Sequence, residues 1–391
     1  MPTSPDTPAP APPRRDILAL SESDLAALVA DMRLPRFRAT QLWEWLWVHR
    51  AASFDEMTNL PKSLRANLAA AYRIPRPMIA IGQESADGTR KYLVSLDDAP
   101  TAPEPTAAAP GPAGTPEPPA ADPEPPEPTH VETVAIPSAG GSRLTVCVST
   151  QAGCQMGCTF CATGRAGFER NLAAHEIYAQ VALAAEDFGA RVTNIVCMGQ
   201  GEPFANYNAT IAAMRLANDP RLTGIGARHI TISTCGITSG IRRLAAEPEQ
   251  FTLAVSLHSA IQKTRDALMP GAKSWPLDSL RTALTDYATA TRRRPSLEYA
   301  LIDGRNDDDA HLEALCAWCS DMLCHVNLIT LNPLDSDAGA APSVEQMRPS
   351  PHLEKFRRTL ESRGIETSVR TSRGSDIAAA CGQLRQHLVV L

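Results

Sequence analysis

Three cysteines stand close together in this chain, at Cys154, Cys158 and Cys161, with the spacing C-x3-C-x2-C. Three thiolates grouped in this way can hold three corners of an iron–sulfur cube and leave the fourth iron without a protein ligand. An iron left open can bind a substrate or cofactor and pass an electron to it. A structural zinc site more often shows two separated C-x2-C pairs, which supply four closed ligands. The spacing therefore favours a redox cluster with an open iron.

A second group of cysteines lies further along the chain, at Cys316, Cys319 and Cys324, with His325 as a conceivable fourth ligand. Cys316 and Cys319 fall on an expected helix among apolar residues, so core packing is favoured over metal binding there. No apolar run approaches the roughly 18–20 residues of a membrane span, and no signal-peptide pattern follows the start. We therefore expect no membrane association and a reducing cytoplasm, where clustered cysteines indicate metal binding or redox chemistry.

The net charge of −6 argues against a nucleic-acid partner, but its distribution weakens that argument. The stretch from Asp97 to His130 holds seven acidic residues and no Lys or Arg, so the rest of the chain sums to +1. Arginine-rich spots, including Arg370 with Arg373, are each expected to be solvated faces. They permit RNA binding without demonstrating it.

Composition divides the chain into five parts. A Pro/Ala-rich, disordered tail is expected before a small helical domain that resembles a helix-hairpin-helix unit and begins at the capping box Ser21–Asp24. A connector with one strand follows, and a Pro/Ala/Glu-rich insertion then separates two strands that would otherwise form a hairpin; its composition cannot bury enough apolar surface to fold. The expected boundaries are 1–15 for the tail, 16–75 for the helical domain, 76–98 for the connector, 99–130 for the insertion and 131–391 for the catalytic domain.

Beyond Arg143, strands alternate with helices, which predicts parallel strands joined by right-handed crossovers. About six such units are too few for an eight-fold barrel but fit a partial one, so the expected fold class is α/β with a partial (β/α)6 barrel. Function collects at the carboxyl ends of such strands. The expected strands are 144–149, 192–198, 229–234, 252–257, 297–302, 326–331 and 366–370.

The cysteine motif after the first strand, together with Met198–Pro203 after the second, resembles the radical S-adenosylmethionine enzymes. Further matches at Gly153–Cys161, Arg170–Leu172 and Arg373–Leu384 narrow the resemblance to the RlmN/Cfr family of RNA methyltransferases. The resemblance extends from the N-terminal helices to the end of the chain, apart from the Pro-rich insertion. It implies a radical S-adenosylmethionine barrel, one [4Fe–4S] cluster, and two S-adenosylmethionine molecules consumed per turnover.

The resemblance also implies an activity: methylation of C2 of adenine in large-subunit rRNA, at the peptidyl-transferase centre, and in tRNA beside the anticodon. The expected route uses an S-methylcysteine and a 5′-deoxyadenosyl radical. RNA and an electron donor such as flavodoxin or ferredoxin are the implied partners, and a monomer is expected. Two alternatives stay open, namely methylation of C8 of the same rRNA adenine and a non-catalytic RNA-binding protein that holds zinc.

Roles for individual residues follow from the same resemblance. Cys381 matches the methyl carrier, Cys147 the cysteine that resolves the protein–RNA cross-link, and Glu132 the proton acceptor. The cluster ligands are Cys154, Cys158 and Cys161. The residues that match S-adenosylmethionine contacts are Gly201, Glu202, Ser233, Ser256, Leu257, His258 and Asn332.

Overall fold

The computed structural model describes residues 14–96, 128–332, 334 and 347–384. The chain divides into two compact units, which are described separately: Met1–Arg76 with Leu96–Thr129, and Pro77–Ser95 with His130–Leu391. The expected disordered tail and Pro-rich insertion lie almost entirely outside the described residues. Of the helices that are described, none is long and apolar enough to cross a membrane.

The smaller unit is helical. Its first helix starts with the predicted capping box: the Ser21 hydroxyl accepts the Asp24 amide at 3.1 Å, and the Asp24 carboxylate accepts the Ser21 amide at 2.9 Å. Leu42, Trp43, Leu46 and Trp47 are buried and form an apolar stripe in the core of this unit. The elements are β1 (Arg15–Asp16), α1 (Glu22–Asp31), α2 (Phe37–Trp43), the π-helix η2 (Glu44–Val48), α3 (Lys62–Ala71) and β2 (Tyr72–Arg73).

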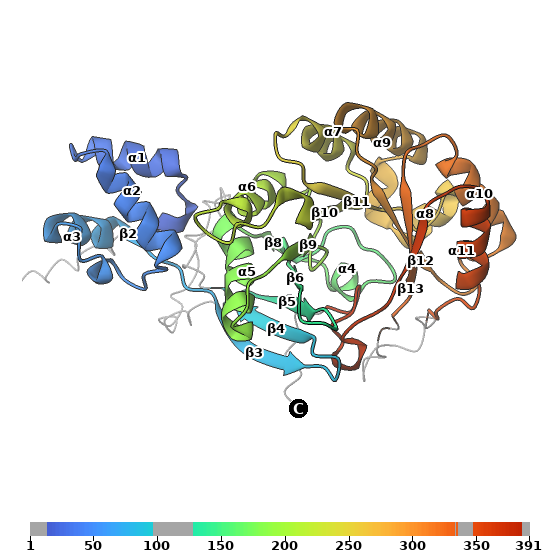
Figure 1. The fold of residues 1–391 in the computed structure, drawn as a ribbon, viewed down its shortest axis with the longest axis horizontal. Helices are drawn as coiled ribbons and strands as arrows, with labels where there is room; N and C mark the ends of the chain where they lie inside the picture. The colour runs from blue at the N-terminus through green and yellow to red at the C-terminus, as the bar shows by residue number, and fades with distance from the viewer. Residues whose placement is uncertain (1–13, 97–127, 333, 335–346, 385–391) are drawn as a thin grey trace, which may run out of the picture. The chain divides into compact units, whose positions relative to one another are not determined.

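The larger unit is built on one curved sheet (Figure 1). Among the described residues it has ten strands in the order β14-β13-β12-β11-β10-β9-β6-β5-β4-β3. The seven from β6 to β14 are parallel, whereas β3, β4 and β5 extend the sheet antiparallel. The strands are β3 (Met78–Glu84), β4 (Arg90–Ser95), β5 (His130–Pro137), β6 (Leu144–Cys147), β9 (Asn194–Cys197), β10 (Ile230–Thr234), β11 (Thr252–Ser256), β12 (Ser296–Leu301), β13 (His325–Thr330) and β14 (Thr367–Arg370).

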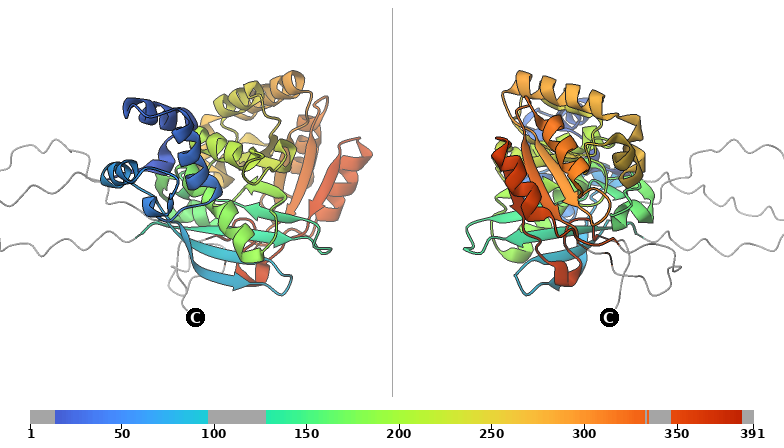
Figure 2. Two further views of the ribbon diagram at one scale, coloured as in Figure 1. Left: turned by 60° about the vertical axis from the view of Figure 1, so that its left-hand side comes forward. Right: turned by 90° about the vertical axis from the view of Figure 1, so that its right-hand side faces the viewer.

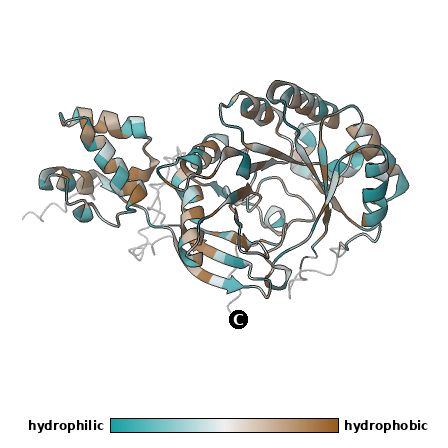
Figure 3. Ribbon diagram, viewed as in Figure 1, coloured by the Kyte–Doolittle hydropathy of each residue, from teal (hydrophilic) through white to brown (hydrophobic). Residues whose placement is uncertain are grey.

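Helices cover the outer side of the curved sheet, and α4 lies within its curve (Figure 1). One face of α5 packs inward, with Ile177, Val181 and Ala184 buried. Helix α11 lies against β13 and β14 (Figure 2), and its outer side is polar while the central strands are largely apolar (Figure 3). The helices are α4 (Ala162–Ala166), α5 (Ala174–Phe188), α6 (Tyr207–Asn218), α7 (Thr238–Ala246), α8 (Gln262–Leu268), α9 (Leu277–Thr291), α10 (Asp309–Cys319) and α11 (Leu353–Ser362).

The partial barrel and all seven predicted parallel strands are confirmed, as is the antiparallel pairing of the two strands that flank the insertion. In the larger unit three strands were not predicted, and in the smaller unit the two-residue strands β1 and β2 were not predicted either. Strand β3 lies at the sheet edge and is mostly exposed, so it lacks a clear alternation of buried residues. Strands β7 (Gln151–Gly153) and β8 (Phe168–Asn171) form a separate short pair, too brief for a periodic signal.

The loop from Cys154 to Cys161, called the cysteine loop below, is hydrogen-bonded to the segment that follows β11. The Thr159 amide donates to the carbonyl of Leu268 at 2.9 Å, and the Gly271 amide donates to the carbonyl of Met156 at 2.9 Å. A Cβ on Gly271 would lie 2.7 Å from the Met156 Cα. The backbones therefore approach each other as closely as glycine allows.

We expect Gly271→Ala to lower the free energy of unfolding by about 1–3 kcal/mol, because the added methyl overpacks a backbone contact. Gly140→Ala is the matched control, since a Cβ there meets nothing within 4 Å; it should change stability by less than about 0.5 kcal/mol. Urea unfolding of both variants measures the difference. Equal stability of the two would contradict this account of the loop.

Candidate active site

One pocket opens at the carboxyl ends of the parallel strands and gathers most of the predicted site residues. They come from the loops after β6 and β9, the ends of β10 and β11, the segment after β13, and the C-terminal segment. Those that line this pocket, called the cluster pocket below, are Cys154, Cys158, Cys161, Gly201, Glu202, Ser233, Ser256, His258, Asn332 and Cys381.

The three cysteines of the motif face this pocket with free thiols. Burial raises the pKa of Cys154 to about 12 and raises the pKa of Cys158 and of Cys161 as well. Within the described ranges, no three His, Cys, Asp or Glu side chains lie close enough to hold a single metal ion. An iron–sulfur cube is held by cysteine thiolates, each bound to a different iron, and three cysteines line this pocket. The donor set therefore fits a cluster.

The second cysteine group packs in the core, as predicted. Cys316, Cys319 and Cys324 are all buried. The Cys319 and Cys324 thiols interact with each other, which together with burial raises the pKa of Cys319.

The glycine-rich turn after β9 brings a buried carboxylate to the pocket wall. Gly201 has φ +102°, and a Cβ there would lie 2.7 Å from Gln151, so the position requires glycine. Glu202 accepts the backbone amides of Phe204 at 3.0 Å and Cys235 at 2.7 Å. Burial nevertheless raises the pKa of Glu202. Its oxygens retain lone pairs that could accept a ligand's ammonium group.

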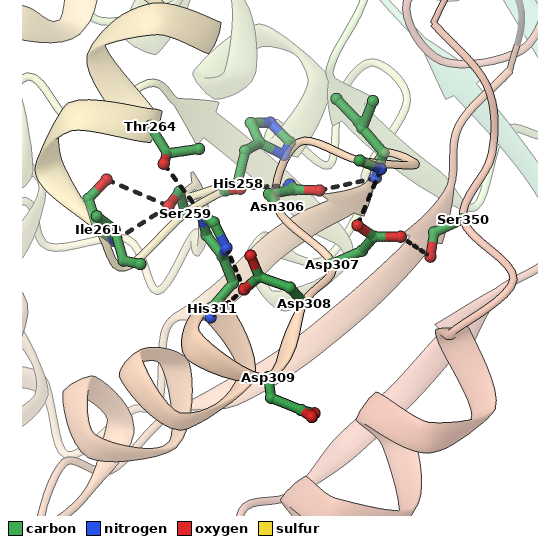
Figure 4. A network of polar contacts seen from close by, with 12 residues as sticks. His258, Ser259, Ile261, Thr264, Asn306, Asp307, Asp308, Asp309, His311 and Ser350 are labelled. Carbon is green, nitrogen blue, oxygen red and sulfur yellow. Dashed lines mark hydrogen bonds and ion pairs between the residues drawn. The ribbon is translucent and has the colours of Figure 1, made fainter.

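His258 is held in a left-handed conformation, with φ +54°, by a fully buried asparagine (Figure 4). Asn306 donates to the carbonyl of His258 at 2.6 Å and to that of Ala300 at 2.7 Å. The His258 Nδ1 accepts the Ala300 amide at 3.0 Å, which leaves the ring proton on Nε2. Burial lowers the pKa of His258 to about 3, so the ring is neutral at physiological pH. Sequence patterns did not point to Asn306.

A second pocket adjoins the first and contains the other two predicted cysteines. Cys147 at the end of β6 and Cys381 both line it, and Cys381 also lines the cluster pocket. The C-terminal segment is held there because the Ala162 amide donates to the Gly382 carbonyl at 2.7 Å and the Thr163 hydroxyl donates to that of Leu384 at 2.8 Å. Residues far apart in sequence therefore share one reaction space, called the thiol pocket below.

The two thiols of this pocket have different environments. Cys381 is exposed, whereas Cys147 is buried. Burial, reinforced by Cys381, raises the pKa of Cys147 to about 12, and the positive charge of Arg370 opposes that rise. Arg370 lines both pockets. The expectation that Arg370 belongs to a solvated face was therefore wrong; it ends a strand whose carboxyl end points at the site.

Glu132 lies beside the thiol pocket on β5 but does not appear in the lining of either pocket. It shares a strand face with Val134, which is the register partner of Cys147. Its carboxylate pairs with the Lys91 ammonium at 3.2 Å, and both side chains are largely buried. Lys91 is the register partner of Val134, so the pair bridges diagonally across β4 and β5.

Comparison with known proteins accounts for this arrangement. A family model described as the ribosomal RNA large subunit methyltransferase N-terminal domain matches residues 15–74, and the radical SAM superfamily matches residues 148–313. The chain is 41% identical over 380 residues to the dual-specificity RNA methyltransferase RlmN of Nitratidesulfovibrio vulgaris (strain DP4), covering 95% of this chain and 94% of that protein. The chain belongs to the RlmN family.

Two further relatives agree. A probable dual-specificity RNA methyltransferase RlmN of Gemmatimonas aurantiaca is 43% identical over 352 residues, with 90% of this chain and 86% of that protein covered. The crystal structure of a radical SAM methyltransferase from Sphaerobacter thermophilus superposes with a TM-score of 0.79 at 40% identity, covering 95% of this chain and all of that one. The resemblance to the RlmN family that the motifs carried is thus confirmed along nearly the whole chain.

Membership of the RlmN family confirms the predicted cofactors, a [4Fe–4S] cluster and S-adenosylmethionine. It also excludes the non-catalytic zinc protein as an alternative. Leu257 is the one expected S-adenosylmethionine contact that does not line the cluster pocket: its side chain is fully buried.

Among the lining residues that sequence reasoning missed are Met198, Glu298 and Arg370. Glu298 carried a signal, since a carboxylate inside the apolar strand β12 is rarely buried without a role. Met198 begins the Met198–Pro203 motif, but a methionine carries no signal that distinguishes a pocket residue from a core residue. Arg370 gave no signal of its own, because an arginine at a strand end resembles any surface arginine.

Lys91→Met should lower the free energy of unfolding by about 3 kcal/mol, because it leaves the Glu132 carboxylate buried without its cation. The double variant Lys91→Met, Glu132→Gln should lose clearly less than the sum of the two single losses. Denaturant unfolding of all four proteins at pH 7 gives the coupling free energy. Additive losses, within about 0.5 kcal/mol, would mean that the buried pair is not coupled.

Proposed function

We propose that this protein methylates C2 of adenine in RNA, with Cys381 as the methyl carrier and both large-subunit rRNA and tRNA as substrates. The observation that carries the proposal is the position of Cys381, whose thiol lines both the cluster pocket and the thiol pocket. The names of the relatives, dual-specificity RNA methyltransferases, support the substrate class.

A carrier thiol suits this substrate. C2 of adenine is an electrophilic carbon without a lone pair, so direct polar transfer of a methyl group to it fails. When bound, the cluster and S-adenosylmethionine supply a methyl donor and a 5′-deoxyadenosyl radical. Cys154, Cys158 and Cys161 would hold three of the irons, and the remaining iron stays open for S-adenosylmethionine.

Cys381 would act first as a nucleophile, taking a methyl group on Sγ and losing its thiol proton. One hydrogen atom of that methyl group would pass to the 5′-deoxyadenosyl radical, and the carbon radical left behind would bond to C2 of adenine. Return of one electron from the adduct to the oxidised cluster would then leave a closed-shell thioether between Cys381 and the RNA. Exposure of this side chain supports the role, because the sulfur must meet a bulky nucleic acid. The adenine must leave its stack to reach the sulfur.

Cys147 would resolve the cross-link. Its thiolate would attack the sulfur of Cys381, a Cys147–Cys381 disulfide would form, and the bond between that sulfur and the transferred carbon would break. The carbon would keep the electron pair of that bond and take up a proton, which completes the methyl group. A reductant of the flavodoxin or ferredoxin class must then return both thiols. Burial raises the pKa of Cys147 to about 12 and so disfavours the thiolate. The positive charge of Arg370 opposes that rise and therefore favours formation of the attacking thiolate.

Glu132 would accept the proton that leaves C2 of the adduct. Its strand face points toward the thiol pocket, and its carboxylate pairs with the Lys91 ammonium at 3.2 Å. Gln200 accepts the Glu132 amide at 3.3 Å and joins this strand to the glycine-rich turn.

S-adenosylmethionine would bind along the strand ends. Glu202 would accept its ammonium group, and the neutral His258 offers an Nε2 donor. Asn332 donates to the Cys381 carbonyl at 3.3 Å and so links this site to the methyl carrier. The full proposed set is Gly201, Glu202, Ser233, Ser256, Leu257, His258 and Asn332.

We place the enzyme in the cytoplasm, where its RNA substrates and reduced thiols are found, and we expect it to act as a monomer. Residues 16–75 would form the accessory helical domain and residues 131–391 the catalytic domain. Strands β3 and β4, from the expected connector, complete the sheet of the catalytic domain.

Anaerobic turnover with a deuterated methyl donor, a reductant and rRNA or tRNA should yield 2-methyladenosine by mass spectrometry of the digested RNA. The product should carry two deuterium atoms from the methyl group, because one hydrogen is removed before carbon transfer. Absence of methylated adenosine would refute the proposal, and 8-methyladenosine would replace C2 by C8 as the target.

Cys147→Ala should accumulate a covalent protein–RNA adduct, seen as a slow band on denaturing gels that nuclease removes. Cys381→Ala should form neither adduct nor product. Cys324→Ala, a buried thiol outside both pockets, is the matched control and should turn over normally. Normal turnover by Cys147→Ala would refute the resolving role while leaving the carrier role of Cys381 intact.

A further inference from the structure

Arg265 is a fully buried arginine on α8, with 0% of its surface exposed. Its guanidinium donates to three backbone carbonyls: that of Cys235 at 2.5 Å, that of Trp275 at 3.3 Å and that of Ala272 at 3.4 Å. Its Nε atom has no hydrogen-bond partner among the described residues. Backbone carbonyls satisfy most of the donors but carry no net charge.

The positive charge of Arg265 lacks a matching anion. No carboxylate in the described part of the chain forms an ion pair with it. The adjacent Asp266 is partly exposed and hydrogen-bonds to Gln262 at 2.7 Å. A buried, unpaired guanidinium costs several kcal/mol, and burial accordingly lowers the pKa of Arg265. A negative partner that forms no part of the polypeptide would remove this cost.

The cysteine loop lies next to this charge. Cys235 connects the two: its carbonyl accepts from the Arg265 guanidinium at 2.5 Å, and its thiol lies 3.1 Å from the Met156 Sδ atom, inside the cysteine motif. The carbonyl of Leu268, at the end of the same helix, accepts the Thr159 amide at 2.9 Å. Cys235 is bonded on both sides, since its amide donates to Glu202 and its carbonyl accepts from Arg265.

Helix α8 is fixed in place by a separate set of contacts (Figure 4). The Thr264 hydroxyl, next in sequence to Arg265, lies 2.9 Å from the His311 Nε2 atom. The His311 Nδ1 atom lies 2.7 Å from the Asp308 carboxylate, which also caps α10 by accepting the His311 amide. The tether to α10 restricts movement of the Arg265 backbone away from the cysteine loop.

We propose that Arg265 is a positioning residue whose buried charge acts as the permanent counter-ion of the iron–sulfur cluster and makes that cluster easier to reduce. The proposal rests on the assignment of Cys154, Cys158 and Cys161 as cluster ligands. Reduction adds a negative charge to a group that three thiolates already make anionic. A fixed cation in a low-dielectric interior stabilises the reduced form more than the oxidised form.

The test compares Arg265→Gln, which removes the charge but keeps a donor, with Arg265→Lys, which keeps the charge. Each protein is reconstituted anaerobically, its iron and sulfide are quantified, and the cluster is titrated with EPR detection, without S-adenosylmethionine or RNA. Arg265→Gln should reduce the equilibrium constant for cluster reduction about tenfold, equivalent to a potential about 59 mV more negative for one electron. Arg265→Lys should stay within about threefold of the unmodified protein, a range below one decade of that constant.

Arg293→Gln is the matched control. Arg293 also donates to a backbone carbonyl, that of Phe251 at 2.6 Å, but it does so at the amino end of β11, away from the cysteine loop. Its replacement should leave the cluster potential unchanged. A shift equal to that of Arg265→Gln would overturn the proposal, because the effect would then not depend on proximity.

An unchanged potential in Arg265→Gln with full iron content would also overturn the proposal. If that variant does not fold, Arg265→Lys decides: a potential near that of the unmodified protein supports the counter-ion role, and a tenfold loss refutes it. Failure of the unmodified protein to bind iron and sulfide would instead refute the cluster assignment in the proposed function. The two failures are therefore distinguishable.

Discussion

The hydrogen bond from the Ala162 amide to the Gly382 carbonyl connects the segment that carries the proposed cluster ligands to the segment that carries Cys381. It fixes the C-terminal segment against the helix that follows the cysteine motif. Together with the bonds from Thr163 to Leu384 and from Asn332 to Cys381, it holds Cys381 at the wall shared by the two pockets. Contacts between residues more than two hundred positions apart thus bring the cysteine motif and Cys381 together.

Several ionisable groups around these thiols are buried away from water, and each is stabilised in a different way. Glu202 is stabilised by backbone amides, His258 stays neutral, and Glu298 accepts hydrogen bonds from Ser296 and Asn327. Burial lowers the pKa of Arg370, but the Cys381, Glu298 and Cys147 side chains, which can carry negative charge, raise it by more. The pKa of Arg370 is therefore raised overall. A site with so few mobile charges can bind charged cofactors without large reorganisation.

Local sequence signals predicted the parallel strands and the cysteine loop because both depend on residues close in sequence. Apolar runs between helical segments indicated each strand of the barrel, and spacing alone marked the cluster ligands. The short pair β7–β8 and the edge strand β3 gave no such periodicity. Asn306, Arg370 and Arg265 could not be found in this way, because their roles come from partners brought near by the fold. Resemblance to a family, rather than spacing, linked Cys147 with Cys381.

The two strands that flank the Pro-rich segment end as a matched pair, since Ser95 is the register partner of His130. The connection between them therefore begins and ends at neighbouring positions, at the same end of two adjacent strands. The entropic cost of closing a flexible loop rises only with the logarithm of its length, about 0.6 kcal/mol for each doubling. Selection on stability hence constrains the length of this connection weakly. A change in the length of this connection should therefore leave the pairing of β4 with β5, and the place of Glu132 on β5, unchanged.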